Sequence, residues 1–255
     1  MILYFSGTGN TKLLAERLSK ELVDEARSLD EGLLGDGLAL FSEKPYVIMS
    51  PIHAWGMPQK VEELLLSSDL SGGQEVYFLL TMGANHGGME SRLLNMSRAM
   101  GLTYKGLYPF LMPNNYFMGE TLQDEDEQVS IIKSAYKELD EVANRISLHQ
   151  SLVGVEDRRG GALLRLFAPL IHKMYCKYGQ KGYKFSVSDE CIRCGRCVEN
   201  CPTHNIKLQD GKITFGKQCM TCLRCVSVCP VQAIDVNGKA GKNGILHLDR
   251  LIAKL

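Results

Sequence analysis

The sequence contains the runs CIRCGRCVENCP at residues 191–202 and CMTCLRCVSVCP at residues 219–230. Both have the spacing C-x-x-C-x-x-C-x-x-x-C-P, and every cysteine and proline of the first run recurs 28 residues later in the second. Apolar residues recur at the same interval, at Val198 and Val226 and at Ile206 and Ile234. This regularity indicates an internal duplication of one metal-binding unit.

The duplicated unit accounts for eight of the nine cysteines. Cysteines at every third position allow one short loop to point three thiolates at the same centre, and a fourth must come from elsewhere. This suits an iron–sulfur cubane, which needs four thiolate ligands. Structural zinc sites, the alternative, usually consist of separated C-x-x-C pairs with four ligands per ion. The spacing therefore favours two [4Fe–4S] clusters over zinc. The remaining Cys176 is predicted to be a small apolar residue of a helix.

Over residues 186–236 the sequence resembles the bacterial two-cluster ferredoxins. In that family the fourth cysteine of each run ligates the other cluster. The resemblance therefore implies two crossed ligand sets. One set is Cys191, Cys194, Cys197 and Cys229, and the other is Cys219, Cys222, Cys225 and Cys201.

The first 150 residues alternate between β-prone apolar runs and stretches with helical spacing. Strands are predicted at residues 1–6, 46–50, 75–82 and 107–112, with one more at either Ala26–Leu29 or Leu38–Phe41. Helices are predicted at residues 11–24, 61–66, 88–100 and 124–146. Such alternation predicts an α/β fold, a doubly wound parallel five-stranded sheet covered by helices on both faces.

The first predicted strand runs directly into the sequence SGTGNT at residues 6–11 and then into a helix. Glycines permit a tight turn, and hydroxyls and amides at a helix start can surround a phosphate. The loop lacks the Gly-Lys-Ser/Thr of a P-loop, and Lys12 interrupts a full G-x-G-x-x-G fingerprint. It resembles the phosphate loop of flavodoxins, which bind FMN where the first and third strands part. The candidate phosphate-binding residues are Ser6, Thr8, Gly9, Asn10 and Thr11.

The resemblance to flavodoxins covers residues 1–150 and implies that the loops after the third and fourth strands hold the isoalloxazine ring of FMN. The candidates are Pro51, Ile52, His53, Ala54, Trp55 and Gly56 in one loop, and Thr81, Met82, Gly83, Asn85, Gly87 and Gly88 in the other. Trp55, the sole tryptophan, is predicted to stack on the flavin, and simple packing is the alternative. Asn115 and Tyr116 are candidates for contact with the flavin edge, with ordinary loop packing as the alternative.

Charge divides the chain into an acidic and a basic half. Residues 1–157 contain 12 Lys and Arg against 23 Asp and Glu, a net charge of −11, and residues 158–255 contain 17 against 6, a net charge of +11. We expect the basic half to dock on the acidic one, although separate ancestry of two domains would also explain the asymmetry. Residues 158–184 contain seven basic residues and no acid. The amphipathic pattern at 161–175 is expected to pack between the domains, and a membrane surface or a partner is the alternative.

The predicted organisation has four parts. They are a flavodoxin-like FMN-binding domain at 1–150, a basic linker with an amphipathic helix at 151–185, a small α+β ferredoxin domain with two [4Fe–4S] clusters at 186–236, and a C-terminal tail at 237–255. This organisation resembles the fused flavodoxin–ferredoxin proteins of anaerobes, which implies electron transfer between FMN and the clusters. Expected partners are redox proteins or a small-molecule electron acceptor, and no nucleic-acid-binding motif is visible. A flavoenzyme that reduces a bound organic substrate and a cluster-based redox sensor are the alternatives.

The sequence also predicts a location. Residues 1–5 lack the basic region of a signal peptide, and no uncharged apolar stretch approaches the roughly 18 residues of a membrane span. We therefore expect a reducing cytoplasm, where cysteines are metal ligands rather than disulfides.

Overall fold

A central sheet of five parallel strands forms the N-terminal part of the structure, a computed structural model that describes residues 1–156, 158–182 and 184–255. The strands lie in the order β2-β1-β4-β6-β7. Their bounds are Ala26–Ser28, Ile2–Tyr4, Tyr46–Pro51, Glu75–Met82 and Thr103–Leu111, in that order. β2 lies on one side of β1, and β4, β6 and β7 follow on the other side. The direction in which the chain adds strands therefore reverses between β1 and β4, as in flavodoxin. The predicted flavodoxin-like fold is confirmed.

Both candidates for the second strand are strands, but only one joins the central sheet. β2 pairs with β1, whereas β3 (Ala39–Ser42) pairs in parallel with β5 (Asp69–Gly72) in a separate two-stranded sheet. The hydroxyl of Tyr46 links the two sheets, because its single hydrogen can be donated to the carbonyl oxygen of Ser71 at 2.7 Å or to that of Leu40 at 3.0 Å.

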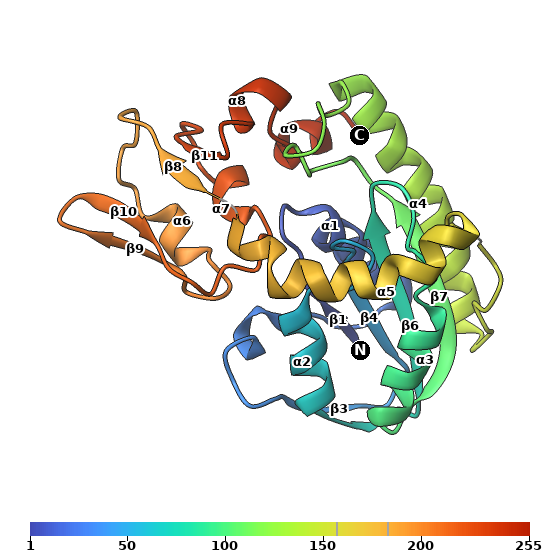
Figure 1. Cartoon of the computed structure of the whole chain (residues 1–255). Helices are drawn as coiled ribbons and strands as arrows, with labels where there is room; N and C mark the ends of the chain where they lie inside the picture. Colours follow the sequence, from blue (N-terminus) through green and yellow to red (C-terminus); the bar gives the residue numbers. More distant parts are fainter. Residues whose placement is uncertain (157, 183) are drawn as a thin grey trace.

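Helices cover both faces of the central sheet (Figure 1). α1 (Asn10–Leu22) and α4 (Glu125–Ser147) contribute to one apolar core. α2 (Gln59–Ser67) and α3 (Glu90–Ala99) contribute to the other. Asp124 caps α4 because its carboxylate accepts a hydrogen bond from the amide of Glu127, 2.9 Å away.

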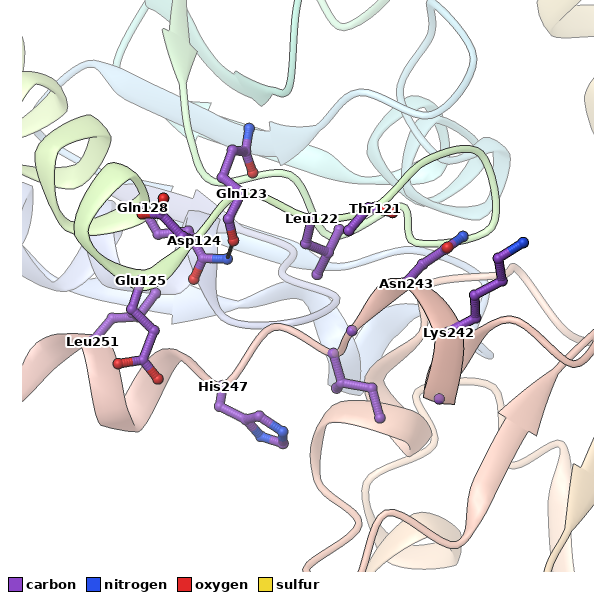
Figure 2. Close-up of a pocket in the computed structure, with 13 residues that line it drawn as sticks. Thr121, Leu122, Gln123, Asp124, Glu125, Gln128, Lys242, Asn243, His247 and Leu251 are labelled. Atoms are coloured by element: carbon purple, nitrogen blue, oxygen red, sulfur yellow. Dashed lines mark hydrogen bonds between the residues drawn. The ribbon is translucent and has the colours of Figure 1, made fainter.

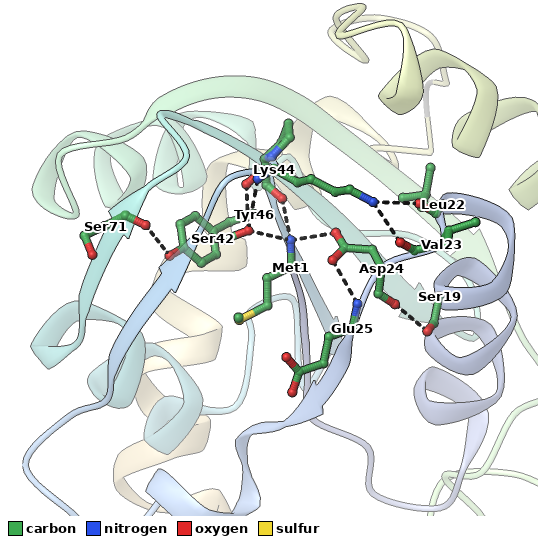
Figure 3. A network of polar contacts seen from close by, with 11 residues as sticks. Met1, Ser19, Leu22, Val23, Asp24, Glu25, Ser42, Lys44, Tyr46 and Ser71 are labelled. Atoms are coloured by element: carbon green, nitrogen blue, oxygen red, sulfur yellow. Dashed lines mark hydrogen bonds and ion pairs between the residues drawn. The ribbon is translucent and has the colours of Figure 1, made fainter.

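A network of polar contacts fixes the sheet at the N-terminal ends of its strands (Figure 3). The amino group of Met1 donates to the carboxylate of Asp24 at 2.7 Å and to the carbonyl oxygen of Pro45 at 2.9 Å. Lys44 in turn donates to the last carbonyl oxygens around the end of α1. The loop at residues 6–11 follows β1 and therefore lies at the opposite edge of the sheet.

The small C-terminal region repeats one structural unit. β8 (Phe185–Val187) pairs with β11 (Ile234–Val236), and β9 (Ile206–Gln209) pairs with β10 (Lys212–Phe215). The two short helices α6 and α7, Arg196–Glu199 and Arg224–Ser227, are offset by the same 28 residues as the cysteine runs. A separate apolar core fills this region, in which the rings of Phe185 and Phe215 stack at 4.6 Å. The duplication read from the sequence is thus a duplication of structure.

The C-terminal tail packs on the N-terminal part. α8 (Ala240–Asn243) and α9 (Leu248–Ile252) follow the ferredoxin-like region, and Leu251 is buried in the core beside α1 and α4. The tail borders a cavity of about 430 Å³ in front of α4 (Figure 2). There the amide of Leu122 donates to the carbonyl oxygen of Asn243 at 2.9 Å. None of the cysteines lines this cavity.

Helix α5 (Ala162–Lys177) connects the two parts of the molecule. It crosses the front of the N-terminal domain and ends near the ferredoxin-like region (Figure 1). The single-turn elements η1 (Leu29–Gly32) and η2 (Gly179–Gly182) complete the description.

Candidate functional site

The structure sorts the eight repeated cysteines into two groups of four, each around a small cavity. In each group three cysteines come from one run and the fourth comes from the other. The first group is Cys191, Cys194, Cys197 and Cys229, and the second is Cys201, Cys219, Cys222 and Cys225. These are the crossed sets that the resemblance to ferredoxins implies. The fit with a four-thiolate cluster is therefore good in both cavities, while ligation itself stays a prediction.

The loops that carry the cysteines turn through left-handed backbone at equivalent positions of the two repeats. Arg193 and Thr221 have φ values of 55° and 54°. Two residues further on, Gly195 has φ 79° and Leu223 has φ 60°. A glycine adopts this conformation without strain, whereas a leucine loses roughly 1–2 kcal/mol. Leu223 is only 5% exposed in the apolar core, so burial of its side chain offsets the strain.

Backbone amides point at the sulfur atoms. The amide of Asn205 donates to Cys201 Sγ at 3.3 Å, and the equivalent amide of Ala233 donates to Cys229 Sγ at 3.2 Å. Such hydrogen bonds stabilise a thiolate and tune the potential of a cluster. Burial raises the pKa of Cys222 to about 12, so an anionic sulfur at this position needs positive charge beside it. Bound iron would supply that charge.

In the part of the chain that the structure describes, no three histidine, cysteine or acidic side chains converge on one point closely enough to hold a single metal ion. The four sulfurs of each group are instead spread around a cavity.

The loop at residues 6–11 forms a turn suited to a phosphate. Gly9 has φ 110°, and α1 begins at the next residue, so the first amides of the helix lack intrahelical partners. Among the described residues, Ser6 Oγ is buried without a hydrogen-bond partner. The loop borders a cavity of about 840 Å³. An unsatisfied hydroxyl, a glycine turn and a helix start together fit a bound phosphate group.

Neighbouring strand ends meet at this loop. Thr11 Oγ1 lies 2.7 Å from Thr81 Oγ1, and the amide nitrogen of the Asn10 side chain donates to the carbonyl oxygen of Pro113 at 2.8 Å. Thr8 Oγ1 accepts a hydrogen bond from the Asn115 side chain at 2.6 Å. The structure thus places Asn115, a candidate for contact with the flavin edge, beside the phosphate loop, and its contact with a flavin stays a prediction.

The two candidate ring-binding loops lie together, with α5 packed on both. Pro51 ends β4, and the amide of Ile52 donates to the carbonyl oxygen of Thr81 at 2.9 Å. Ala54 and Trp55 form a turn with φ 47° and 64° between His53 and Gly56, whose backbones pair.

The side chain of Trp55 contacts protein on several sides. Its Nε1 donates to Asn85 Oδ1 at 3.0 Å, and a Cβ atom at Gly87 would lie 2.8 Å from the Trp55 ring and 2.9 Å from Ala168 of α5. His172 of α5 covers the other loop, because a Cβ atom at Gly56 would lie 2.4 Å from its ring. Of the remaining candidates, Met82 ends β6, Gly83 lies near Asn114 and Gly88 lies against Arg165 of α5.

The structure does not join these loops to the cavity over the phosphate loop. That cavity is lined by residues of β1, of the phosphate loop, of α1, of the ferredoxin-like region and of the tail, together with Ser28 and Asp30, and by none of the ring-loop candidates. Stacking of Trp55 on a flavin stays a prediction.

Sequence reasoning missed the residues that join the phosphate loop to the second cysteine group. Arg224 Nε donates to the carbonyl oxygen of Gly7 at 3.3 Å, and Nη2 donates to that of Ser6. A Cβ atom at Gly7 would lie 2.4 Å from the carbonyl oxygen of Cys222. The repeat has an arginine at the same position of the first run, Arg196, so the sequence held no signal that singled out Arg224.

Comparisons with known proteins agree with the reading of the C-terminal region. Residues 190–234 match the 4Fe-4S dicluster domain family. No curated protein matches the chain. The described residues form no helix long and apolar enough to cross a membrane.

Among solved structures, the Trp repressor binding protein from Bacillus subtilis is 14% identical with a TM-score of 0.36, over 57% of this chain and 97% of that one. An NADH:FMN oxidoreductase in its apo form is 15% identical with a TM-score of 0.37, over 59% and 89%. General stress protein 14 from Treponema denticola, in complex with FMN, is 10% identical with a TM-score of 0.37, over 57% and 97%. At such values these likenesses carry no argument about what this chain binds.

Proposed function

We propose that the chain is an electron-transfer protein that binds two [4Fe–4S] clusters through the crossed cysteine groups and FMN through the loop at residues 6–11. The observation that carries the proposal is the direct packing of this loop on the second cysteine group, at the contact between Gly7 and Cys222. Two redox sites built on adjoining backbone suit electron exchange between them.

The chemistry of the two cofactors explains their combination. When bound, a cluster carries one electron at a time and a flavin carries one or two, so together they collect or split electron pairs. The protein's own contribution is positional. Amides of Asn205 and Ala233 orient Cys201 and Cys229, and Arg224 holds the loop of Ser6 and Gly7 against the second group.

More observations support the binding site for the FMN phosphate than the binding site for the isoalloxazine ring. Ser6 Oγ and the first amides of α1 would hold the phosphate without a lysine or arginine from the loop itself. We favour a carrier over an enzyme that reduces a bound organic substrate, because α5 packs on both loops that would flank the ring. A carrier's partners would be redox proteins or a small-molecule acceptor.

A reducing compartment such as the cytoplasm belongs to the same proposal. All nine cysteines are free thiols in the structure. Thiolates that are to ligate iron must stay unpaired, which a reducing environment ensures.

Anaerobic purification followed by iron, sulfide and flavin analysis tests the assignment. The proposal expects about eight irons and one FMN per chain, and reduction of both centres by one low-potential donor. Two zinc ions per chain, or a full complement of iron without any flavin, would contradict it. Rapid mixing of the reduced protein with an oxidised acceptor would then show whether both centres are oxidised together.

A further inference from the structure

Helix α5 turns its apolar side away from the protein. Leu164, Ala168 and His172, which are spaced by four residues and so share one face, lie toward the N-terminal domain, and the last two are only 1% and 3% exposed. The large apolar side chains beside this face and on the far side of the helix are exposed. They are Leu163 at 72%, Leu166 at 71%, Phe167 at 46%, Leu170 at 54%, Ile171 at 37% and Met174 at 54%. The expectation that this stripe packs between the domains is therefore wrong.

Specific contacts hold α5 in this orientation. His172 Nδ1 lies 2.9 Å from the carbonyl oxygen of His53, and Ala168 fits against Gly87. At the end of the helix the hydroxyl of Tyr175 lies 2.5 Å from Thr221 Oγ1. Rolling the apolar stripe inward would break all three contacts. The exposed stripe is therefore part of the fold, and a contiguous apolar surface of this kind marks an interaction site.

The charge within this segment of the chain has one sign, although Arg158 and Arg159 at its start pair with Glu138 and Glu90, and Glu62 and Glu63 of α2 lie near Cys176 at its end. Residues 158–184 contain seven basic residues and no acid. Within the described residues, Arg165 and Lys173 of α5 are exposed and form no ion pair. Lys177 is exposed as well, and its amino group lies 5.0 Å from the centre of the Tyr178 ring. A partner that binds this surface therefore needs an apolar region that meets the exposed apolar side chains and negative charge that meets the basic residues beside them.

We propose that the outer face of α5 binds the surface of an anionic lipid bilayer, with the helix lying flat in the headgroup region. The apolar side chains form a convex ridge along a helix of 16 residues, about 24 Å long. Such a ridge enters a bilayer to a depth of about 5–10 Å, while basic residues beside it meet anionic headgroups. Tyr178, 60% exposed just beyond the helix, suits the same interface. The proposal does not depend on which cofactors the chain binds.

A bilayer fits these observations better than a partner protein. A protein would need a deep apolar groove as long as the helix and a negative rim on the matching side. A second copy of the chain would bring two basic, acid-free segments together, and their repulsion opposes pairing.

Co-sedimentation of the full, cofactor-loaded chain with lipid vesicles tests the proposal. The probes are vesicles of equal parts phosphatidylglycerol and phosphatidylcholine, and vesicles of phosphatidylcholine alone. We expect binding to the first, weaker binding to the second, and a decrease with added salt. The double variant Leu166→Gln/Leu170→Gln should partition at least about tenfold less. The variant Lys173→Gln/Lys177→Gln should lose most of the preference for anionic vesicles.

The matched control is Val23→Gln/Leu34→Gln, which removes two apolar side chains that are 82% and 48% exposed elsewhere on the surface. It should bind vesicles as the unaltered chain does. No binding by the unaltered chain, or equal binding by the Leu166→Gln/Leu170→Gln variant, would overturn the proposal. So would a dimer in light scattering that this variant dissociates, since a second copy would then cover the stripe.

Discussion

The guanidinium of Arg224 forms a bidentate salt bridge with the carboxylate of Asp30, 194 residues away in the sequence, with Nη1 2.7 Å from Oδ2 and Nη2 3.0 Å from Oδ1. This bidentate pair joins the second cysteine run to the turn after β2. The same side chain lies 5.6 Å from the centre of the Phe5 ring. Further ion pairs between the basic and acidic halves are Arg158–Glu138, Arg159–Glu90 and, at the tail, Lys254–Glu125. The docking expected from the charge asymmetry is thus present, but it rests on few ion pairs and on buried apolar contacts such as Met220.

Replacement of Arg224 should loosen the two halves. Arg224→Met leaves Asp30 and the carbonyl oxygen of Ser6 without their donor, and we expect a loss of about 2 kcal/mol in the free energy of unfolding. Denaturant unfolding of the reconstituted protein measures this. The matched control is Arg196→Met, at the equivalent position of the first repeat, where the arginine is exposed. Equal losses in the two variants would show that Arg224 has no special role at the contact.

Addition of one methyl group at Gly7 should have a similar effect by a different route. Gly7→Ala places Cβ 2.4 Å from the carbonyl oxygen of Cys222, so the loop and the cysteine run must move apart. We expect a loss of about 1–3 kcal/mol in stability and faster proteolysis between the halves. Gly161→Ala serves as the control, since its Cβ meets nothing within 4 Å and its φ is −64°. Wild-type behaviour of Gly7→Ala would mean that the contact is not tight in solution.

Removal of the fourth cysteine of each run should damage the distant cluster. Cys201→Ala should mainly affect the cluster held by Cys219, Cys222 and Cys225, and Cys229→Ala should mainly affect the other. Electron paramagnetic resonance of the reduced variants distinguishes the two clusters. If Cys201→Ala spared the second group and removed only the cluster of its own run, the crossed assignment would be wrong.

The hydroxyl of Ser6 should discriminate between flavins with and without a phosphate. Ser6→Ala removes the buried donor that has no partner among the described residues, and we expect FMN binding to weaken by about 1–3 kcal/mol. Riboflavin lacks the phosphate, so its affinity should hardly change. Fluorescence titration of both ligands gives the comparison. Equal losses for both ligands, or equal affinities of the unaltered chain for them, would remove the phosphate site from residues 6–11. Thr8 and Thr11 are less direct tests, since both hydroxyls already have protein partners.

Acid should destabilise the fold through His53. Burial, and secondarily the neighbouring His172, lowers the pKa of His53 from 6.5 to about 4. Between these values the unfolded chain holds a proton on His53 that the folded chain does not, so stability falls as the pH decreases from 6.5 to 4. The contribution is at most about 3.4 kcal/mol. Thermal unfolding of the unaltered chain and of His53→Gln across this range gives the effect as a difference. Parallel curves would mean that His53 is not responsible.

Much of the N-terminal fold could be predicted because its patterns are local. The apolar runs of β4 and β6 and the spacing of α1 and α4 appear where the sequence indicated. The second strand stayed ambiguous because Ala26–Ser28 and Ala39–Ser42 are both short and β-prone. Each of the two strands could pair with β1 or with β5. Which pairing forms depends on the strand edges that are free in the assembled fold, and the local sequence does not contain this information.

The position of α5 could not be predicted for a related reason. An amphipathic pattern identifies the two faces of a helix but not the surface that each one meets. Here the face with the smaller side chains packs against the N-terminal domain, because Ala168 allows close approach to Gly87 and His172 lies within hydrogen-bond distance of a backbone carbonyl group. The sequence of the tail indicates no function, yet Leu248 lies on the phosphate loop, 2.6 Å from where a Cβ of Gly9 would be.

The two cysteine groups differ in their access to the outside. In the first group Cys194 is exposed and the neighbouring Ile192 is 61% exposed, whereas Met220 and Thr221 beside the second group are 4% and 5% exposed. Under the proposed function, the first group is therefore the one that an outside electron donor can reach, whereas the second exchanges electrons within the molecule. Residues 192–194 can change to suit a new donor without disturbing the internal junction. The duplicated unit thus provides one exposed group that can adapt to a partner and one buried group that keeps its contact with the N-terminal domain.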